Sequence, residues 1–473
     1  MAVMGYSIDM KRRMTKRRGK MNRGHRDKRQ GKRPHLVFLI TFCMVVTVGL
    51  AGLFLMKGFV GKSVERKEAE KKTDTWPAAA DSGESGGTLT LFGERIPERG
   101  KEAADPHRGR ENAEGAGDGA EAEPEPAGRY AAELADEEYL KENRILPWEA
   151  GSDEEVTLGF VGDILFDDEY AIMASLKSRG GALENGISPA LLEKMREVDI
   201  MVVNNEFPYT NRGTPTEGKT FTFRADVDTV AYLRDMGTDV AILANNHLYD
   251  FGETGLLDTL DTLEGAGIPG VGAGRNIKEA SAPLYFIVND IKIAIVAATQ
   301  IERLENPDTK GATENSAGVF RCLNPQKLYE TVARAKENSD FVIVYIHWGT
   351  EFMEEPDWAQ LEQGSGLAAA GADLIIGDHP HCLQGIAYID GVPAIYSLGN
   401  FWFNSRTADS CMVRVTIGRE GLKAFQFIPA IQSGCRVDLA YDEEKTRILE
   451  YMRSLSPGVS IDGEGYIGLK DSR

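Results

Sequence analysis

Cysteine is scarce in this chain of 473 residues, which contains five. Cys43 lies in an uncharged apolar run, and no two cysteines form the C-x-x-C pattern of a thiolate metal site. An exported domain can oxidise its thiols, but spacing alone assigns no pairs among the other four, so the sequence leaves their disulfide pairing open. These four are Cys322, Cys382, Cys411 and Cys435. A metal site in this protein would therefore use nitrogen and oxygen ligands.

Charged residues are absent from residues 36–56, a run of 21 that is long enough to cross a bilayer as a helix. Residues 1–34 hold thirteen Lys or Arg and two Asp, a net charge of +11. Positive charge collects on the cytoplasmic side of a first membrane span. We therefore expect a basic cytoplasmic tail over 1–34, a transmembrane signal-anchor helix over 35–57, and an extracellular C-terminal domain in a single-pass protein of the cell membrane.

A secretory signal peptide also begins with basic residues and turns apolar, so it is the alternative interpretation of this N-terminus. Its apolar region is shorter than the run seen here, however, and a small-x-small cleavage site follows it. No clear site of that kind follows Met56. We interpret the basic tail as a signal for membrane topology rather than as a nucleic-acid-binding segment.

Residues that could build a core are few after the apolar run, where Glu, Ala, Gly and Pro predominate. This composition predicts an acidic flexible linker over 58–150, in which residues 131–141 favour a short helix. We expect one folded domain over 151–440 and a C-terminal extension over 441–473.

The expected domain is acidic. The chain carries −19 overall, residues 1–34 carry +11 and residues 35–150 carry −8, so residues 151–473 carry −22. Such a charge repels nucleic acids and other polyanions at long range, and we predict no nucleic-acid partner. Binding of any polyanion would need a local reversal of charge by metal ions and by basic residues such as Arg212, Lys219, Arg224 and Arg406.

Strand and helix patterns alternate from Val156 onward, without an internal repeat. Apolar runs predict strands over 156–163, 199–204, 239–243, 341–347 and 374–376, and a hairpin over 284–288 and 291–297. Helical patterns begin at Ser188-Pro189 and cover 226–236, 252–267 and 325–338. This alternation is typical of an α/β fold with layered sheets and helices.

Four of the seven histidines lie at or just beyond the ends of predicted strands, where open α/β sheets place their sites. They are His247, His347, His379 and His381, whereas His25, His35 and His107 precede the expected domain. Asp163 and Glu206 occupy equivalent places after the first two strands. Imidazole and carboxylate ligands suit Mn, Fe, Zn or Mg, and the sequence does not distinguish these metals. One or two divalent ions are expected, and hydrolysis is the natural use of such a site.

Six motifs in this order resemble those of the CapA family of poly-γ-glutamate capsule biosynthesis proteins, which is similar to the calcineurin-like metallophosphoesterases. The motifs are GFVGD, NNE, NNHLYDFG, IHWGTEF, GADLIIGDHPHCLQG and YSLGNFWF. The resemblance covers about residues 156–432. It implies a metallophosphoesterase-like sandwich of mixed sheets flanked by helices. It also implies a membrane-anchored, exported protein in synthesis or export of an anionic γ-linked glutamate polymer, with membrane subunits of polymer synthesis as partners.

The resemblance also implies roles for individual residues. Metal ligands would be Asp163, Glu206, Asn246, His347, His379 and His381. His247 would protonate the leaving group or stabilise the transition state, and Asp250 would fix the orientation of its ring. Two departures from the wider phosphoesterase pattern stand out: Leu165 replaces the His of an Asp-x-His motif, and Glu206 replaces a bridging Asp. One metal site is therefore expected to be weak or empty.

Further candidates for substrate binding border the expected site: Asn204, Asn245, Trp348, Glu351 and Asn400. The asparagines would be hydrogen-bonding groups at the edge of the site. Trp348 would either line the substrate or pack beside the site, and Glu351 follows His347 closely enough to reach the cleft.

Three functions remain open at the level of sequence. The first is a tethered metal-dependent hydrolase or transferase that acts on a phosphoryl or γ-glutamyl group during extracellular polymer assembly. The second is a non-catalytic scaffold or export subunit that binds the polymer. The third is an extracellular phosphodiesterase that acts on small phosphate esters.

Overall fold

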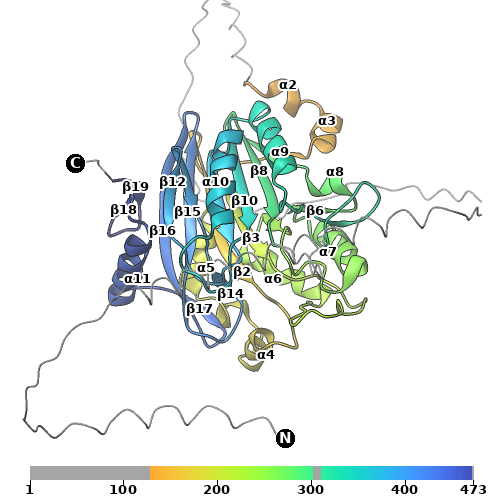
Figure 1. The fold of residues 1–473 in the computed structure, drawn as a ribbon, viewed down its shortest axis with the longest axis vertical. Helices are drawn as coiled ribbons and strands as arrows, with labels where there is room; N and C mark the ends of the chain where they lie inside the picture. Colours follow the sequence, from red (N-terminus) through yellow and green to blue (C-terminus); the bar gives the residue numbers. More distant parts are fainter. Residues whose placement is uncertain (1–127, 302–309, 471–473) are drawn as a thin grey trace, which may run out of the picture. The chain divides into compact units, whose positions relative to one another are not determined.

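The computed structural model describes residues 128–301 and 310–470. The expected cytoplasmic tail, the expected membrane span and most of the expected linker lie outside this part of the chain. No helix within the described ranges is long and apolar enough to cross a membrane. The described residues fold into two main β-sheets with covering helices (Figure 1).

The first sheet has seven strands, of which the central ones are parallel. They are β1 (Ile145–Pro147), β7 (Leu284–Val288), β8 (Ile291–Thr299), β10 (Phe341–His347), β11 (Leu374–Asp378), β12 (Ile386–Ile389) and β13 (Val392–Ile395). Their order is β1-β7-β8-β10-β11-β13-β12. Strands β7 and β8 form the predicted hairpin. Its turn residues Asn289 and Asp290 have φ of 52° and 60°, as a two-residue turn of type I′ requires.

The second sheet is mixed and has the order β17-β16-β15-β2-β3-β4-β5, with one further short strand paired to its centre. Its strands are β2 (Glu155–Ile164), β3 (Ile200–Asn205), β4 (Val240–Ile242), β5 (Gly270–Val271), β14 (Asn400–Trp402), β15 (Ala408–Gly418), β16 (Gly421–Ser433) and β17 (Arg436–Leu439). The described residues also form two small sheets of two strands each. In one, β6 (Ala273–Gly274) pairs with β9 (Gly318–Val319), and in the other, β18 (Val459–Ile461) pairs with β19 (Ile467–Leu469). Strands β2, β3 and β4 are parallel, so their carboxyl ends share one edge.

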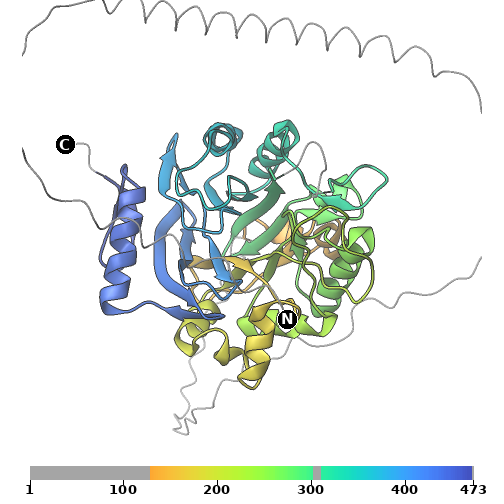
Figure 2. The same ribbon diagram turned by 60° about the horizontal axis from the view of Figure 1, so that its bottom comes forward.

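Helices cover the outer face of each sheet (Figures 1 and 2). The helices over the second sheet are α4 (Ala171–Ser178), α5 (Pro189–Arg196), α6 (Val230–Met236) and α7 (Gly252–Ala266), and those over the first sheet are α9 (Gln326–Glu337) and α10 (Trp358–Ala370). The described residues also form α2 (Ala131–Leu134), α3 (Glu137–Glu142), α8 (Ile277–Ala280) and α11 (Asp442–Leu455). Helix α10 shows how particular residues determine where a helix begins and ends. Asp357 accepts hydrogen bonds from the backbone N–H groups of Ala359 and Gln360, and Gly371 ends the helix with a φ of 104°.

Three apolar cores separate the layers. Odd-numbered residues of β10 from Phe341 to Tyr345 pack between the two sheets, whereas even-numbered residues from Val342 to Ile346 pack under α9 and α10. The third core lies between the second sheet and helices α4 to α7. The order helix, sheet, sheet, helix confirms the predicted layered α/β sandwich.

The folded unit begins before residue 151, so the predicted boundary between linker and domain is wrong. Strand β1 pairs in parallel with β7, and Leu140 and Ile145 are buried against Ile287. The short helix expected over residues 131–141 is present as the two turns of α2 and α3. This stretch has only a few apolar residues among many charged ones, and its strand is three residues long, so its composition resembles that of a linker.

The segment expected as a C-terminal extension packs onto the second sheet. Helix α11 buries Ile448, Leu449 and Met452 in the core that the two sheets share. Within its described part, which ends at residue 470, the extension therefore contributes to the core of the domain.

Candidate metal centre

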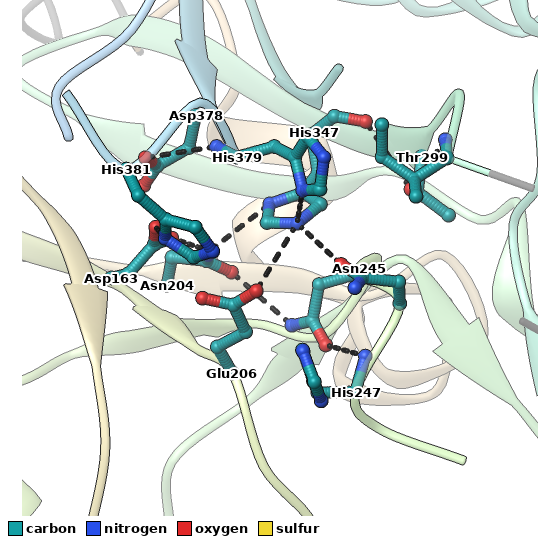
Figure 3. A network of polar contacts seen from close by, with 12 residues as sticks. Asp163, Asn204, Glu206, Asn245, His247, Thr299, His347, Asp378, His379 and His381 are labelled. Carbon is teal, nitrogen blue, oxygen red and sulfur yellow. Dashed lines mark hydrogen bonds and ion pairs between the residues drawn. The ribbon is translucent and has the colours of Figure 1, made fainter. Parts of the chain in front are cut away.

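The candidate ligands come from strand ends of both sheets. Asp163 lies near the end of β2 and Glu206 directly follows β3, in the second sheet. His347 is the last residue of β10, and His379 and His381 follow β11, in the first sheet. Because these strands end at the same side of the sandwich, their side chains converge on one centre (Figure 3).

Two groups of potential metal ligands share one carboxylate. Glu206, His347 and His379 form the first group, and Asp163, Glu206 and His381 form the second. In each group the ligand atoms lie within 4.8 Å of one another. Glu206 therefore stands between two potential metal positions, where the resemblance places a bridging carboxylate.

The surroundings of the Glu206 side chain indicate whether a cation fits at this centre. Its side chain is fully buried, and neither of its oxygens has a hydrogen-bond partner. Burial raises the pKa of this carboxyl group well above its usual range, and the nearby carboxylates of Asp163 and Asp378 raise it further. A buried carboxylate without donors costs free energy unless a cation offsets its charge. The residues present fit one or two divalent ions.

His347 completes the first group together with Asn246. Its Nε2 lies 2.8 Å from Oδ1 of Asn246, 3.1 Å from Nδ1 of His379 and 3.4 Å from Oε1 of Glu206. Burial lowers the pKa of His347 to about 3 and also lowers that of His379, so both imidazoles are neutral. Neutral imidazoles are the form that binds metal. The ligand-type atoms of Asn246, His379 and Glu206 thus all lie within 3.4 Å of Nε2 of His347.

The second group centres on Asp163 and His381. His381 Nδ1 lies 3.0 Å from Oδ2 of Asp163 and 3.0 Å from Oδ1 of Asn400. Burial acts to raise the pKa of Asp163, but the hydrogen bond and the charge of His381 lower it overall. Burial acts to lower the pKa of His381, and the same contact with Asp163 raises it overall. Asn204 Nδ2 donates to Oδ1 of Asp163 at 2.6 Å, which fixes the carboxylate.

Two of the candidate ligands have unusual backbone conformations. His379 and His381 have φ of 101° and 57°, and such conformations cost about 1–3 kcal/mol for a residue with a side chain. Gly162 permits the approach of β2 to the loop before β14, because a Cβ there would lie 1.8 Å from the carbonyl oxygen of Gly399. Strained backbone of this kind is concentrated at functional sites.

His247 and Asp250 lie beside the metal ligands. Nδ1 of His247 is 2.7 Å from Oδ2 of Asp250, and the His247 ring stacks on Phe223 with 4.2 Å between centroids. Lys219 pairs with Asp250 and donates to the backbone oxygen of Asn246. Burial raises the pKa of Asp250 to about 7 although Lys219 acts to lower it, and burial lowers the pKa of His247.

Comparison with known proteins identifies a family. The family described as "Bacterial capsule synthesis protein PGA_cap" matches residues 157–405, which include every ligand candidate. The chain belongs to this family. The "PGA biosynthesis protein CapA" of Bacillus subtilis (strain 168) is 30% identical over 285 residues, which cover 59% of this chain and 72% of the relative. The "Capsule biosynthesis protein CapA" of Bacillus anthracis is 30% identical over 318 residues, which cover 64% and 74%.

Solved structures give a weaker comparison. The sulfate thiohydrolase SoxB from Thermus thermophilus, solved with glycerol, superposes with a TM-score of 0.34 at 14% identity and covers 63% of this chain and 60% of that one. No conclusion about fold or ligands rests on a similarity of this size. Membership of the PGA_cap family, by contrast, confirms the resemblance to CapA proteins on the sequence motifs quoted above.

Most candidate residues of this PGA_cap protein lie in one network. Asn245 Nδ2 donates to Oδ1 of Asn204 at 3.2 Å, and Oδ1 of Asn245 accepts from the backbone N–H groups of His247 and Leu248. These asparagines are buried and serve to orient ligands. Glu351 is exposed, and its charge raises the pKa of His381, which places it at the rim of the centre.

Trp348 does not line the centre, so its prediction as a substrate-binding residue is wrong. Its ring is fully buried in the core under α9 and α10, and Nε1 donates to the backbone oxygen of Tyr396 at 2.9 Å. Successive residues of a strand face opposite sides. Because His347 faces the metal centre, the next residue faces the helices.

Leu165 is buried in the core between the second sheet and its helices, and it supplies no ligand. Asp378 and Lys219 also lie at the centre, although neither was predicted as a ligand or catalytic residue and Lys219 was expected only as one of the basic residues that could reverse the local charge. Asp378 is fully buried, accepts a hydrogen bond from the Tyr345 hydroxyl at 2.8 Å, and lies in the same motif as two of the histidines. That motif is the signal that could have identified it. Lys219 comes from a loop far from Asp250 in sequence, and no spacing pattern links the two.

Proposed function

We propose that this chain acts in the biosynthesis or export of a poly-γ-glutamate capsule polymer, and that it hydrolyses or transfers a phosphoryl or γ-glutamyl group at its metal centre. The observation that supports catalysis most directly is Glu206, a buried carboxylate without hydrogen-bond donors that belongs to two groups of metal ligands. The polymer is inferred from family relatives whose names refer to PGA and capsule biosynthesis. The expected ions are Mn, Fe, Zn or Mg.

Divalent ions at such a centre polarise a phosphoryl or acyl oxygen and lower the pKa of a bound water. The chain's own residues position the substrate and move the proton. The Asp250 carboxylate accepts a hydrogen bond from Nδ1–H of His247, which leaves Nε2 as the atom that takes up a proton and passes it to the leaving group. Lys219 holds Asp250 in place through an ion pair in which both side chains are buried. Phe223 covers one face of the His247 ring and excludes water from it.

The proposal includes attachment to the cell membrane. The uncharged run over residues 36–56 and the basic tail before it support an anchor with its N-terminus in the cytoplasm. In this arrangement the folded domain works outside the cell, next to membrane subunits of polymer synthesis. A nucleic-acid partner is not part of the proposal, since the domain is acidic.

Metal content and turnover test the proposal together. The full chain, purified in detergent, would be compared with His379→Ala and His381→Ala by elemental analysis and by hydrolysis of a simple phosphodiester. His107→Ala is the matched control, since it lies outside the centre in sequence. We expect one or two ions per wild-type chain, and a loss of both metal and turnover in the two site variants alone. A folded wild-type chain that binds no metal after Mn or Zn is supplied would contradict the metal centre.

His247→Ala separates an enzyme from a scaffold. We expect this variant to retain its metal and to lose turnover, because His247 is not a member of either ligand group. Cells that carry it should then make less polymer. If cells with His247→Ala lose turnover but make the normal amount of polymer, a scaffold is favoured. If the wild-type chain hydrolyses phosphodiesters and loss of this activity causes no polymer defect, a small-molecule phosphodiesterase is favoured.

A further inference from the structure

An exposed aromatic ring is held beside the metal centre by an unfavourable backbone conformation. Phe352 is 58% exposed and has a φ of 61°, which is a rare conformation for a bulky side chain. Its backbone N–H donates to the carbonyl oxygen of Pro380 at 2.7 Å, within the motif that supplies His379 and His381. The Phe352 ring lies 6.0 Å from the His381 ring, centroid to centroid. Exposure and strain together mark a residue held in place for contact with a ligand.

A cation lies over the same ring. The guanidinium of Arg406 is 5.6 Å from the centroid of Phe352. Arg406 is exposed, and this contact is the one that its guanidinium makes within residues 128–301 and 310–470. Its five N–H donors therefore remain available to a ligand. Phe352 follows β10 and Arg406 precedes β15, so two distant segments meet at this rim of the centre.

We propose that Phe352 and Arg406 form a subsite that binds one carboxylate-bearing unit of an anionic chain next to the group that reacts. This proposal rests on the proposed function and names the feature of the substrate that the rim recognises. A guanidinium matches a carboxylate with two parallel hydrogen bonds. The phenyl ring packs against the methylene groups that separate the carboxylate from the backbone of such a chain.

The charges around the rim set the direction of binding. Glu351 is exposed and directly precedes Phe352 in the chain, so its carboxylate repels a carboxylate that approaches it. Arg406 attracts one to the face of the Phe352 ring that its guanidinium covers. A chain with a carboxylate on every unit is therefore placed with one of these groups at Arg406 while the bond to be broken lies over the metal ligands.

A groove with basic side chains lies elsewhere in the domain, and it serves as the internal comparison. Lys194, Arg414 and Lys445 line a groove of about 210 Å³ between α5, the second sheet and α11. Lys445 is paired with Glu464 at 2.7 Å. This groove contains no member of the metal centre, so variants in the groove and in the rim report on different places.

Binding tests the subsite without any need for turnover. The full chain in detergent, with Mn²⁺ supplied, would be titrated into a short fluorescein-labelled oligomer of γ-linked glutamate and into the same oligomer with its carboxylates amidated. We expect Arg406→Gln to weaken binding of the charged oligomer about tenfold, because charge-assisted hydrogen bonds are lost. Arg406→Lys should restore part of the affinity, since it keeps the charge and loses the two-pronged geometry. The amidated oligomer should bind weakly to every variant.

Phe352→Gly distinguishes recognition from structure. Glycine adopts a φ of 61° without strain, so the variant should unfold at or above the wild-type temperature and still bind the oligomer several-fold more weakly. The paired control Lys194→Gln with Arg414→Gln should bind as the wild type does. Unchanged affinity in Arg406→Gln, or a loss confined to the groove control, would overturn the subsite. Because binding is measured, a chain that binds the oligomer at the rim but turns nothing over would refute the enzyme and retain the subsite.

Discussion

Replacing Glu206 by Gln should remove the stabilisation that metal gives this protein without weakening the metal-free fold. Both oxygens of Glu206 are buried and lack hydrogen-bond donors, so the amide replaces a group that makes no hydrogen bond in the absence of metal. The side chain keeps its size, which avoids a cavity. The expected loss of metal-dependent stabilisation therefore comes from removal of the charge of Glu206, which belongs to both groups of ligands.

The magnitude follows from linkage between binding and folding. An ion at one hundred times its dissociation constant stabilises the folded state by about 2.7 kcal/mol per site. Two sites that share Glu206 would give about 5 kcal/mol, and in a domain of this size each kcal/mol raises the unfolding temperature by about 2 °C. Wild-type protein should thus gain about 10 °C on addition of Mn²⁺, and a single functional site would give about half of that.

Calorimetry of the full chain with and without Mn²⁺ measures this effect in wild type, Glu206→Gln and the exposed control Glu193→Gln. Without metal, Glu206→Gln should unfold at or above the temperature of wild type and of Glu193→Gln, because the neutral amide removes the cost of a buried charge. Of the three proteins, only Glu206→Gln should fail to respond to metal. A full metal-dependent rise in Glu206→Gln would refute the bridging role. A large drop in its metal-free temperature would show that Glu206 has a structural function in the fold.

Three further changes test other parts of the structure. Asp250→Asn should lower turnover about 10-fold to 100-fold with metal content unchanged, as seen by kinetics and elemental analysis, because the ring of His247 loses its orienting carboxylate. Deletion of all residues before Gly151 should cost about 3–6 kcal/mol in urea unfolding, since it removes the buried Leu140 and Ile145. Trp348→Phe should lower stability by about 1–3 kcal/mol and leave KM unchanged, since its indole bonds to Tyr396 within a core.

The regular part of the fold was predictable because its signals are local. Strand β10 begins and ends at the predicted residues, Phe341 and His347, since a run of β-branched and aromatic residues has no helical alternative there. The hairpin of β7 and β8 followed from Asn289-Asp290 between two apolar runs. Strand β1 was missed because its three residues are fixed by pairing with β7, which is more than a hundred residues away.

The site was predictable to the extent that it lies on strand ends. Histidines and acids that follow strands converge wherever those strands are parallel, so their meeting required only the order of strands. Lys219 could not be found in this way, because it lies in a loop whose path is determined by tertiary packing. The sequence could have predicted that Trp348 points away from the centre. Side chains alternate between the two faces of β10, so His347 and the residue after it cannot both face the centre.

The candidate metal centre takes its ligands from both sheets, and this leads to a last prediction. Asp163 and Glu206 belong to the second sheet, whereas His347 and the histidines after β11 belong to the first. An ion bound by either group would therefore link both sheets. Metal should slow amide hydrogen exchange in β2 and β10 by similar factors. Protection confined to one sheet would show that the ligands are drawn from that sheet alone, and it would contradict a centre shared by both.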